Sequence, residues 1–291
     1  MPRWLEDAVQ RVAGADDSTQ VVRWRSGGRT FEFDVPGDNV WVCIKDDLLL
    51  REYEWMGVQP DQARDLVVDG GAHVGTFTAM AAGTAQQVLA VEAHPTTAAL
   101  LRGNVARNHL ENVEVVEAAL WPERGTVSFQ AEGQSSSASV IGAGESAGDV
   151  EVTTLTLDDL VAEHGPIDLL KLDVEGAEHR LLHETPDGVF ADVRSLVGEL
   201  HLWAGGDDAE AAFAWRLEAL GYVVEVRQLP IHHVRDSLKR VRRNAGDLEG
   251  YTRLKLTLAG VYAVTGLIDP IIGLRKHINA RDLRLFRAWR P

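Results

Sequence analysis

Residues 66–75 read LVVDGGAHVG, an apolar run that ends on an aspartate and is followed by glycines at positions 70, 71 and 75. A short apolar run bounded by glycine is typical of a buried strand. The next residues, TFTAMAAG at 76–83, are typical of a helix. The stretch predicts a strand–turn–helix unit. It leaves open whether the turn only connects the two elements or also brings its main chain close to a ligand.

The same alternation continues along the chain. Further short apolar runs predict strands, and the segments between them predict helices. The predicted strands are 65–69, 88–92, 113–120, 167–173, 194–203 and 222–229, and the clearest helices are 76–83, 95–108 and 207–221. Strands that alternate with helices of this length form βαβ units and a parallel sheet. The predicted fold class is therefore α/β, with a doubly wound sheet.

The composition restricts the class of protein. A chain of 291 residues with 45% hydrophobic residues suits one large α/β domain with additions. Its net charge of −15 argues against nucleic acid as a partner. The single cysteine, Cys43, lies in VWVCIK, where we expect a buried strand, and it excludes a disulfide framework or a cysteine-rich zinc site. No apolar leader stands at the start, so we expect a cytoplasmic protein.

The charge is spread unevenly, which divides the chain. Residues 227–291 contain 14 Lys and Arg and 5 Asp and Glu, so this part is basic whereas the rest is acidic. We expect three parts: a β-rich lead-in or cap at 1–60, a ligand-binding core at 61–228, and a basic and apolar extension at 229–291 that could complete the sheet.

The extension suggests a contact surface. Residues 235–244, RDSLKRVRRN, have helical spacing and many basic side chains. Residues 256–268 are apolar but too short to span a bilayer, which takes about 20 residues. The simplest interpretation is further packed elements. The alternative is an interface, either between two copies of the chain or with an anionic membrane at its periphery.

Three predicted strands end on an acid: Asp69, Glu92 and Asp173. Ligands of doubly wound sheets bind beyond the carboxyl ends of the strands, so these acids are candidate ligand contacts. GGAHVG also fits a loose dinucleotide fingerprint. However, Asp69 would place a carboxylate beside the pyrophosphate of a dinucleotide, and like charges repel. A cationic ligand such as S-adenosylmethionine is favoured, while Glu92 suits ribose hydroxyls in either case.

These residues resemble a family. VVDGGAHVGTFT resembles motif I of class I S-adenosylmethionine-dependent methyltransferases, and VEAHP resembles the acidic motif that follows it. The most specific stretch, IDLLKLDVEGAE at 167–178, resembles the signature of FkbM-type methyltransferases. The ordered series also includes NVARNHLENVEVVEAAL, TLDDL and the pair Glu199 and His201, and it covers roughly residues 50–205. The resemblance implies a Rossmann-like class I methyltransferase sheet with an N-terminal lead-in and a C-terminal extension.

The resemblance also implies which residues bind the cofactor, S-adenosylmethionine. Asp69, Gly71, His73 and Gly75 would line its methionine end, Glu92 and Ala93 its ribose, and Ala118 and Ala119 its adenine. Gly70 belongs to the same turn, although the family more often has an apolar residue there. Asp173 would lie where cofactor and acceptor meet.

For the acceptor, the resemblance implies O-methylation of a hydroxyl on a small molecule, a natural product, or a sugar or glycan. Our catalytic candidates are Asp173, Glu175, Glu199 and His201, and we prefer His201 as the base because its ordinary pKa suits neutral pH. Alternatively, Asp173, Glu199 and His201 hold a divalent metal. Two other functions remain open, a nicotinamide-dependent oxidoreductase and a non-catalytic S-adenosylmethionine-fold binding module.

Three other polar residues have simpler interpretations. Lys171 lies two residues before Asp173, and we expect it to form an ion pair with one of the strand-end acids. His179 and His183 are four residues apart and share one face of the predicted helix. Because HRLLH lacks the glutamate of the zinc-protease pattern, we expect these two histidines to pack or to face solvent rather than to bind a metal.

Overall fold

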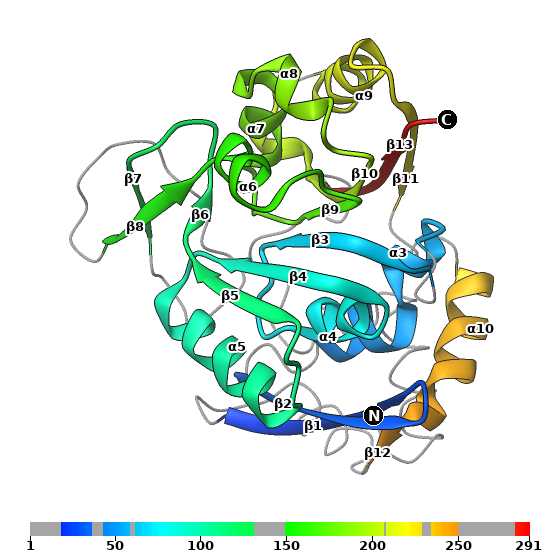
Figure 1. The fold of residues 1–291 in the computed structure, drawn as a ribbon. Coiled ribbons are helices and arrows are strands. Elements are labelled where there is room, and N and C mark those ends of the chain that lie inside the picture. The colour runs from blue at the N-terminus through cyan, green and yellow to red at the C-terminus, as the bar shows by residue number, and fades with distance from the viewer. Residues whose placement is uncertain are drawn as a thin grey trace.

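A central β-sheet organises the computed structural model, which describes residues 19–36, 43–58, 62–130, 149–206, 208–228, 234–249 and 283–291. Within these residues the sheet has seven strands in the order β11-β13-β10-β9-β3-β4-β5. Their bounds are β3 Arg64–Gly70, β4 Ala85–Glu92, β5 Val113–Glu117, β9 Leu169–Leu172, β10 Ser195–His201, β11 Val223–Gln228 and β13 Leu283–Trp289. The predicted α/β class and doubly wound, Rossmann-like sheet are confirmed (Figure 1).

The strand order reverses beside β3. β3 pairs in parallel with both β4 and β9, so the chain builds outward from β3 on one side and later returns to build on the other. Asp69 lies opposite Lys171 in this register, and Gly70 lies opposite Leu172. Ligands bind where the strand order reverses in this way, at the carboxyl ends of the strands.

Helices cover both faces of the sheet, because alternate strand residues are apolar on both sides. Leu66 and Val68 belong to the core under α6, α7 and α9, whereas Val67 and Leu169 pack with Phe77 of α4 on the other face. Figure 1 shows these two groups of helices on opposite sides of β3 and β4. The helix bounds are α3 Glu52–Trp55, α4 Thr76–Ala82, α5 Pro95–Arg107, α6 Leu157–His164, α7 Glu178–Glu184, α8 Asp187–Phe190 and α9 Ala209–Ala219.

A second, antiparallel sheet packs beyond α4 and α5. It consists of β12 Leu248–Glu249, β1 Thr19–Ser26 and β2 Arg29–Pro36. Two asparagines hold it, Asn104 within α5 and Asn108 directly after that helix. They exchange hydrogen bonds with the main chain of β2, Asn104 at Asp34 and Asn108 at Glu32. The asparagine-rich passage of the sequence therefore joins the lead-in to the core.

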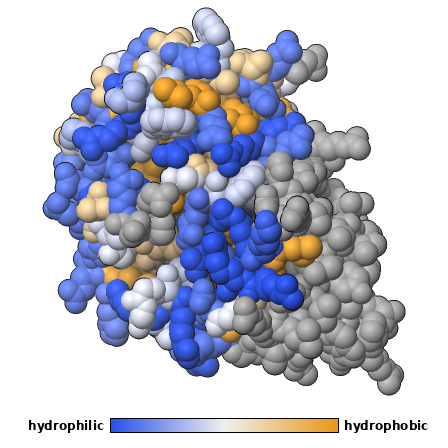
Figure 2. All heavy atoms as spheres, turned by 90° about the vertical axis from the view of Figure 1, so that its right-hand side faces the viewer, coloured by the Kyte–Doolittle hydropathy of each residue, from blue (hydrophilic) through white to orange (hydrophobic). Residues whose placement is uncertain are grey.

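The predicted basic helix is present as α10, Val234–Asn244, with Lys239, Arg242 and Arg243 exposed. Figure 2 shows the face of the molecule that includes α10, where hydrophilic side chains predominate. Three short strands, β6 Ala119–Leu120, β7 Thr126–Gln130 and β8 Asp149–Leu155, form a third sheet. No helix in the described part of the chain combines the length and the apolar character needed to cross a membrane.

One local prediction was wrong. Cys43 begins a π-helix, Cys43–Leu50, instead of lying in a strand, and the short helix α3 follows it. The extension, which we expected could complete the sheet, contributes β13, although residues 283–289 were not singled out as a strand. β13 lies between β10 and β11 in the sheet and is antiparallel to both. The apolar run 256–268 lies outside the described residues.

Candidate active site

The turn after β3 needs glycine at two positions. Gly71 has φ +72°, and a Cβ atom there would lie 1.8 Å from the carbonyl oxygen of Asp173. Gly75 has φ +93°, and its Cβ would lie 2.7 Å from Leu101. Residues with side chains adopt these φ values only at a cost in free energy. A Cβ atom at position 71 would also clash with the main chain, which cannot move aside as a flexible side chain could. The turns after β3 and β9 therefore touch, as the sequence could not show.

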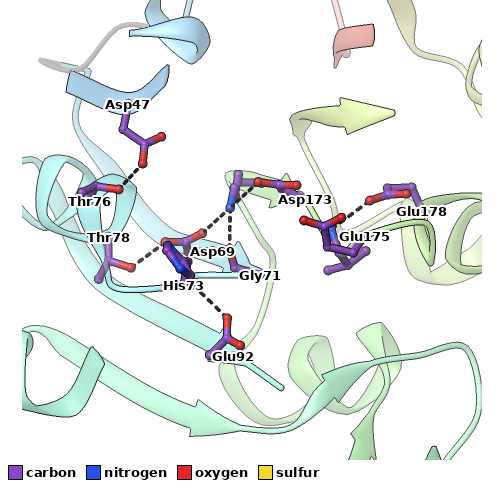
Figure 3. Close-up of polar contacts among 12 residues, drawn as sticks. Asp47, Asp69, Gly71, His73, Thr76, Thr78, Glu92, Asp173, Glu175 and Glu178 are labelled. Carbon is purple, nitrogen blue, oxygen red and sulfur yellow. Dashed lines mark hydrogen bonds and ion pairs between the residues drawn. The ribbon is translucent and has the colours of Figure 1, made fainter. Parts of the chain in front are cut away.

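Asp69 lies beneath this turn and is paired within the protein. Its side chain is fully buried, accepts a hydrogen bond of 2.5 Å from the Thr78 hydroxyl, and lies 3.3 Å from Nζ of Lys171. Lys171 also donates to the Gly71 carbonyl at 2.7 Å and lies 3.6 Å from Asp173 (Figure 3). The predicted ion pair of Lys171 is confirmed. The charge that we expected Asp69 to present to a ligand is largely balanced by this lysine.

Burial alone would lower the pKa of Lys171, but Asp69 and Asp173 outweigh that effect and raise it. The lysine is therefore a permanent cation below the glycine turn. His73 follows in the turn with φ +51°, and burial, together with the charge of Lys171, lowers the pKa of His73 to about 4. Its imidazole is neutral, so it can serve as a polar contact without adding positive charge.

Glu92 joins the turns after β3 and β4. Its carboxylate accepts a hydrogen bond from the main-chain N–H of His73 (Figure 3) and a second from the main-chain N–H of His94, both at 2.9 Å. Burial raises the pKa of Glu92, while these two N–H groups oppose that rise. A carboxylate held at a strand end suits ribose hydroxyls. Ala93 follows Glu92 in the chain, the N–H of Ala118 donates to the Glu92 carbonyl at 3.2 Å, and Ala93 packs against the cluster that contains Ala119. The residues present therefore fit the donor that the sequence predicts.

A second cluster lies after β9 and β10, and we call Glu175, Glu178 and His201 the histidine clamp. Glu178 is fully buried and accepts hydrogen bonds from the N–H groups of Val174 at 2.8 Å and Gly176 at 3.0 Å. Its carboxylate also lies 3.1 Å from Nδ1 of His201, while Glu175 lies 3.4 Å from Nε2. Glu175 has φ +51°, an uncommon conformation for a residue with a side chain, and Glu178 holds the residues on both sides of it.

The clamp corrects our expectation for His201. Only 1% of His201 is exposed, and burial alone would lower its pKa, but Glu178, Glu175 and Asp173 together raise that pKa to about 10. The imidazole is then protonated at neutral pH and cannot accept another proton. Burial raises the pKa of Glu175 to about 8, with His201 opposing and Asp173 adding to that rise. The premise that His201 has an ordinary pKa was wrong.

The proposed metal ligands do come together. Ligand atoms of Asp173, Glu199 and His201 all lie within 4.8 Å of one another. Carboxylates and imidazole are a suitable set for a divalent ion. However, both ring nitrogens of His201 already contact carboxylates, and an imidazolium has no lone pair to offer a metal. In this arrangement, His201 does not fit as a ligand.

Sequence reasoning missed Glu178, Trp203 and Tyr53. Glu178 closes the quoted stretch IDLLKLDVEGAE, and Trp203 follows His201 by two residues, so proximity to the motifs was a usable signal for both. Tyr53 comes from α3, and its ring lies 5.8 Å from Nζ of Lys171. Burial raises the pKa of Tyr53, and the charges of Asp173 and Glu199 add to the rise, which places this tyrosine near both acids.

The two histidines of α7 behave as expected. His179 lies 3.0 Å from the main-chain oxygen of His201 through its Nε2 atom and packs against the ring of Phe213 at 5.8 Å. This confirms a packing role for His179. His183 lies on the exposed side of the helix.

Comparisons with known proteins identify the family of this chain. The model of the methyltransferase FkbM domain matches residues 69–236, more than half of the chain. Comparison with curated protein sequences finds no significant match.

Solved structures with a similar arrangement include other methyltransferases. FkbM methyltransferase from Methylobacillus flagellatus KT is 13% identical, with a TM-score of 0.45, and the match covers 77% of this chain and 54% of that one. TYW2 from M. jannaschii, in complex with AdoMet, is 16% identical over 74% of this chain and 80% of that one, with a TM-score of 0.38. Precorrin-6y C5,15-methyltransferase from Geobacter metallireducens GS-15 is 17% identical over 85% and 92%, with a TM-score of 0.40. On the family match, this chain belongs to the FkbM family of S-adenosylmethionine-dependent methyltransferases.

Proposed function

We propose that this protein is an O-methyltransferase that methylates a hydroxyl on a small molecule, a natural product, or a sugar or glycan. The supporting observation is the group of carboxylates at the carboxyl ends of β9 and β10, directly beside the glycine turn. A hydroxyl must lose its proton as it gains a methyl group, so an O-methyltransferase needs a proton acceptor at this place.

Each residue has a definite role in this proposal. The bound S-adenosylmethionine supplies a methyl carbon activated by its sulfonium group. The glycine turn and Glu92 bind and orient this donor. Asp173 is the proton acceptor, because its main chain touches Gly71 while its side chain, 26% exposed, remains accessible to an acceptor. His201 stays protonated, and its positive charge stabilises the negative charge that develops on the acceptor oxygen.

Each of the two alternative functions differs from the proposed O-methyltransferase in one testable property. A nicotinamide-dependent oxidoreductase would bind a dinucleotide at the glycine turn. The pairing of Asp69 with Lys171 weakens the charge argument against that ligand, so family membership is the stronger argument for a methyl donor. A non-catalytic module would bind the donor but would not depend on Asp173 for any reaction.

Two measurements test the proposal. Calorimetric titration with S-adenosylmethionine, S-adenosylhomocysteine and NAD should show binding of the first two and none of NAD. Incubation with isotope-labelled methyl donor and a panel of hydroxylated compounds should then give a product whose methyl group is bonded to oxygen by NMR.

Asp173→Asn should abolish this turnover while changing the affinity for S-adenosylhomocysteine only a few-fold. Asp187→Asn is the matched control, because Asp187 is an exposed acid that pairs with Arg216 on the outer helices. Transfer to nitrogen or carbon, or full turnover by Asp173→Asn, would overturn the assignment.

A further inference from the structure

One large aromatic side chain stands at the outer edge of the acceptor site. Trp203 lies in the 3₁₀ turn Leu202–Ala204, which directly follows β10. Its ring centroid is 6.2 Å from that of His201, with the two planes at 72°. Half of Trp203 is exposed, whereas His201 is buried. Single exposed aromatic residues are common on protein surfaces, but Trp203 differs from them in its contact with a buried ionised cluster.

The position of this indole is fixed by the loop beneath it. Gly176 has φ +100°, and a Cβ atom there would lie 2.9 Å and 3.1 Å from indole atoms Cη2 and Cζ2 of Trp203. The N–H of Gly176 is in turn held by Glu178. Trp203 is therefore supported by the histidine clamp on two sides, and its remaining surface faces solvent.

The residues become more exposed outward from the buried cluster. Lys171 and His201 are buried, the side chains of Asp173 and Glu175 are 26% and 27% exposed, and Trp203 is 50% exposed. The groups of this cluster that solvent can reach therefore include the Asp173 carboxylate, the Glu175 carboxyl group and the indole of Trp203.

These groups recognise a particular chemistry. Carboxylates accept hydrogen bonds from hydroxyl groups, while an indole packs against the C–H face of a ring. The Asp173 carboxylate repels phosphate or carboxylate groups, which would have to be desolvated beside like charge. The combination favours an uncharged ring that carries several hydroxyls.

We propose that Trp203 is the wall against which the acceptor ring packs, that the Asp173 carboxylate and the Glu175 carboxyl group form hydrogen bonds with its hydroxyls, and that this arrangement selects uncharged polyhydroxylated rings over anionic ones. This inference rests on the proposed function, because it concerns the acceptor of the same reaction. It adds a specificity-determining residue and a charge rule for the acceptor.

The test uses protein labelled with 5-fluorotryptophan and saturated with S-adenosylhomocysteine. Methyl α-D-glucopyranoside and methyl α-L-rhamnopyranoside are the neutral probes, and glucose 6-phosphate is the anionic probe. Trp203→Phe identifies the fluorine resonance of Trp203. Trp215 is the internal control, because it is 68% exposed on α9. We expect the neutral glycosides to shift the Trp203 resonance and to leave that of Trp215 in place, with no shift from glucose 6-phosphate.

Variants complete the test. Trp203→Ala should weaken binding of the neutral glycosides about tenfold, and Trp203→Phe should restore most of it, because an aromatic face remains. Both variants should bind S-adenosylhomocysteine like the parent protein. Three results would overturn the proposed packing of the acceptor ring against Trp203. These are glycoside affinities of Trp203→Ala equal to those of the parent protein, no shift of the Trp203 resonance with either neutral glycoside, or an equal shift with glucose 6-phosphate.

The two proposals fail in different ways. If S-adenosylhomocysteine does not bind, or if methyl transfer goes to an atom other than oxygen, the proposed function fails. If donor binding and O-methylation are intact but Trp203→Ala leaves the KM for a methylated acceptor unchanged, only the inference about Trp203 fails.

Discussion

The histidine clamp makes a sharp prediction for Glu178. Replacing it with alanine removes the acceptor of two main-chain N–H groups and the partner of a buried imidazolium. Breaking a buried ion pair costs about 3–5 kcal/mol, because the remaining charge is left uncompensated. Each N–H group left without a partner adds about 1 kcal/mol. Since typical domains are stable by only about 5–15 kcal/mol, Glu178→Ala should lose a large share of the free energy of unfolding.

Glu178→Gln separates charge from hydrogen bonding. The amide keeps one acceptor oxygen, so we expect a smaller loss, on the order of 2 kcal/mol. The matched control is Glu184→Ala on the same helix. Glu184 pairs with Arg180 at 2.7 Å, but both side chains are largely exposed, and such a pair contributes about 0.3–0.5 kcal/mol.

Urea denaturation followed by circular dichroism measures all four free energies of unfolding. The expected order of stability is parent, Glu184→Ala, Glu178→Gln and then Glu178→Ala. If Glu178→Ala loses no more free energy of unfolding than Glu184→Ala, the stabilising role of Glu178 in the histidine clamp is refuted. Removal of a fully buried carboxylate with three partners should cost much more than removal of an exposed one.

The remaining predictions concern the donor site and pH. Glu92→Ala should weaken S-adenosylhomocysteine binding by about 1–3 kcal/mol in calorimetry, the cost of an unmade charged hydrogen bond, and unchanged affinity would contradict its ribose role. Gly71→Ala should abolish donor binding and lower the thermal midpoint, because its Cβ would lie 1.8 Å from the Asp173 carbonyl oxygen. Gly103→Ala in α5, where the new Cβ has nothing within 4 Å, should instead stabilise by about 0.5–1 kcal/mol. The pKa of His201 is raised from 6.5 to about 10, so its contribution to stability is complete below pH 6.5 and is lost as pH rises towards 10. The stability difference between the parent and His201→Gln should therefore shrink over that range, and a difference that grows with pH would contradict the assigned charge.

The parts of the fold that depend on local sequence could be predicted. β3, β4 and β9 are short apolar runs ended by an acid, and α5 begins at Pro95 as expected, because such patterns act over a few residues. β13 could not be predicted this way. Arg284 and Arg287 interrupt its apolar residues, and its pairing with β10 and β11 joins segments distant in sequence.

In the candidate site, too, the features set by local sequence could be predicted and those set by long-range contacts could not. The motifs identified the positions that surround the donor turn, but they could not give the ionisation of His201, which depends on two carboxylates from another loop. Tyr53 reaches the site from the lead-in, and no spacing in the sequence connects it to Lys171. Charge state and long-range contact are properties of the folded chain, so pattern reading alone does not provide them.

The place of β13 has a consequence for synthesis of the protein. β10 and β11 lie on either side of it, and β13 is made only after residues 229–282 have been added. Until then, a nascent chain carries an exposed strand edge on β10, and such edges promote association between chains. We therefore expect ribosome-bound chains that stop before residue 283 to need chaperone protection, whereas the chain extended through residue 289 closes its own sheet.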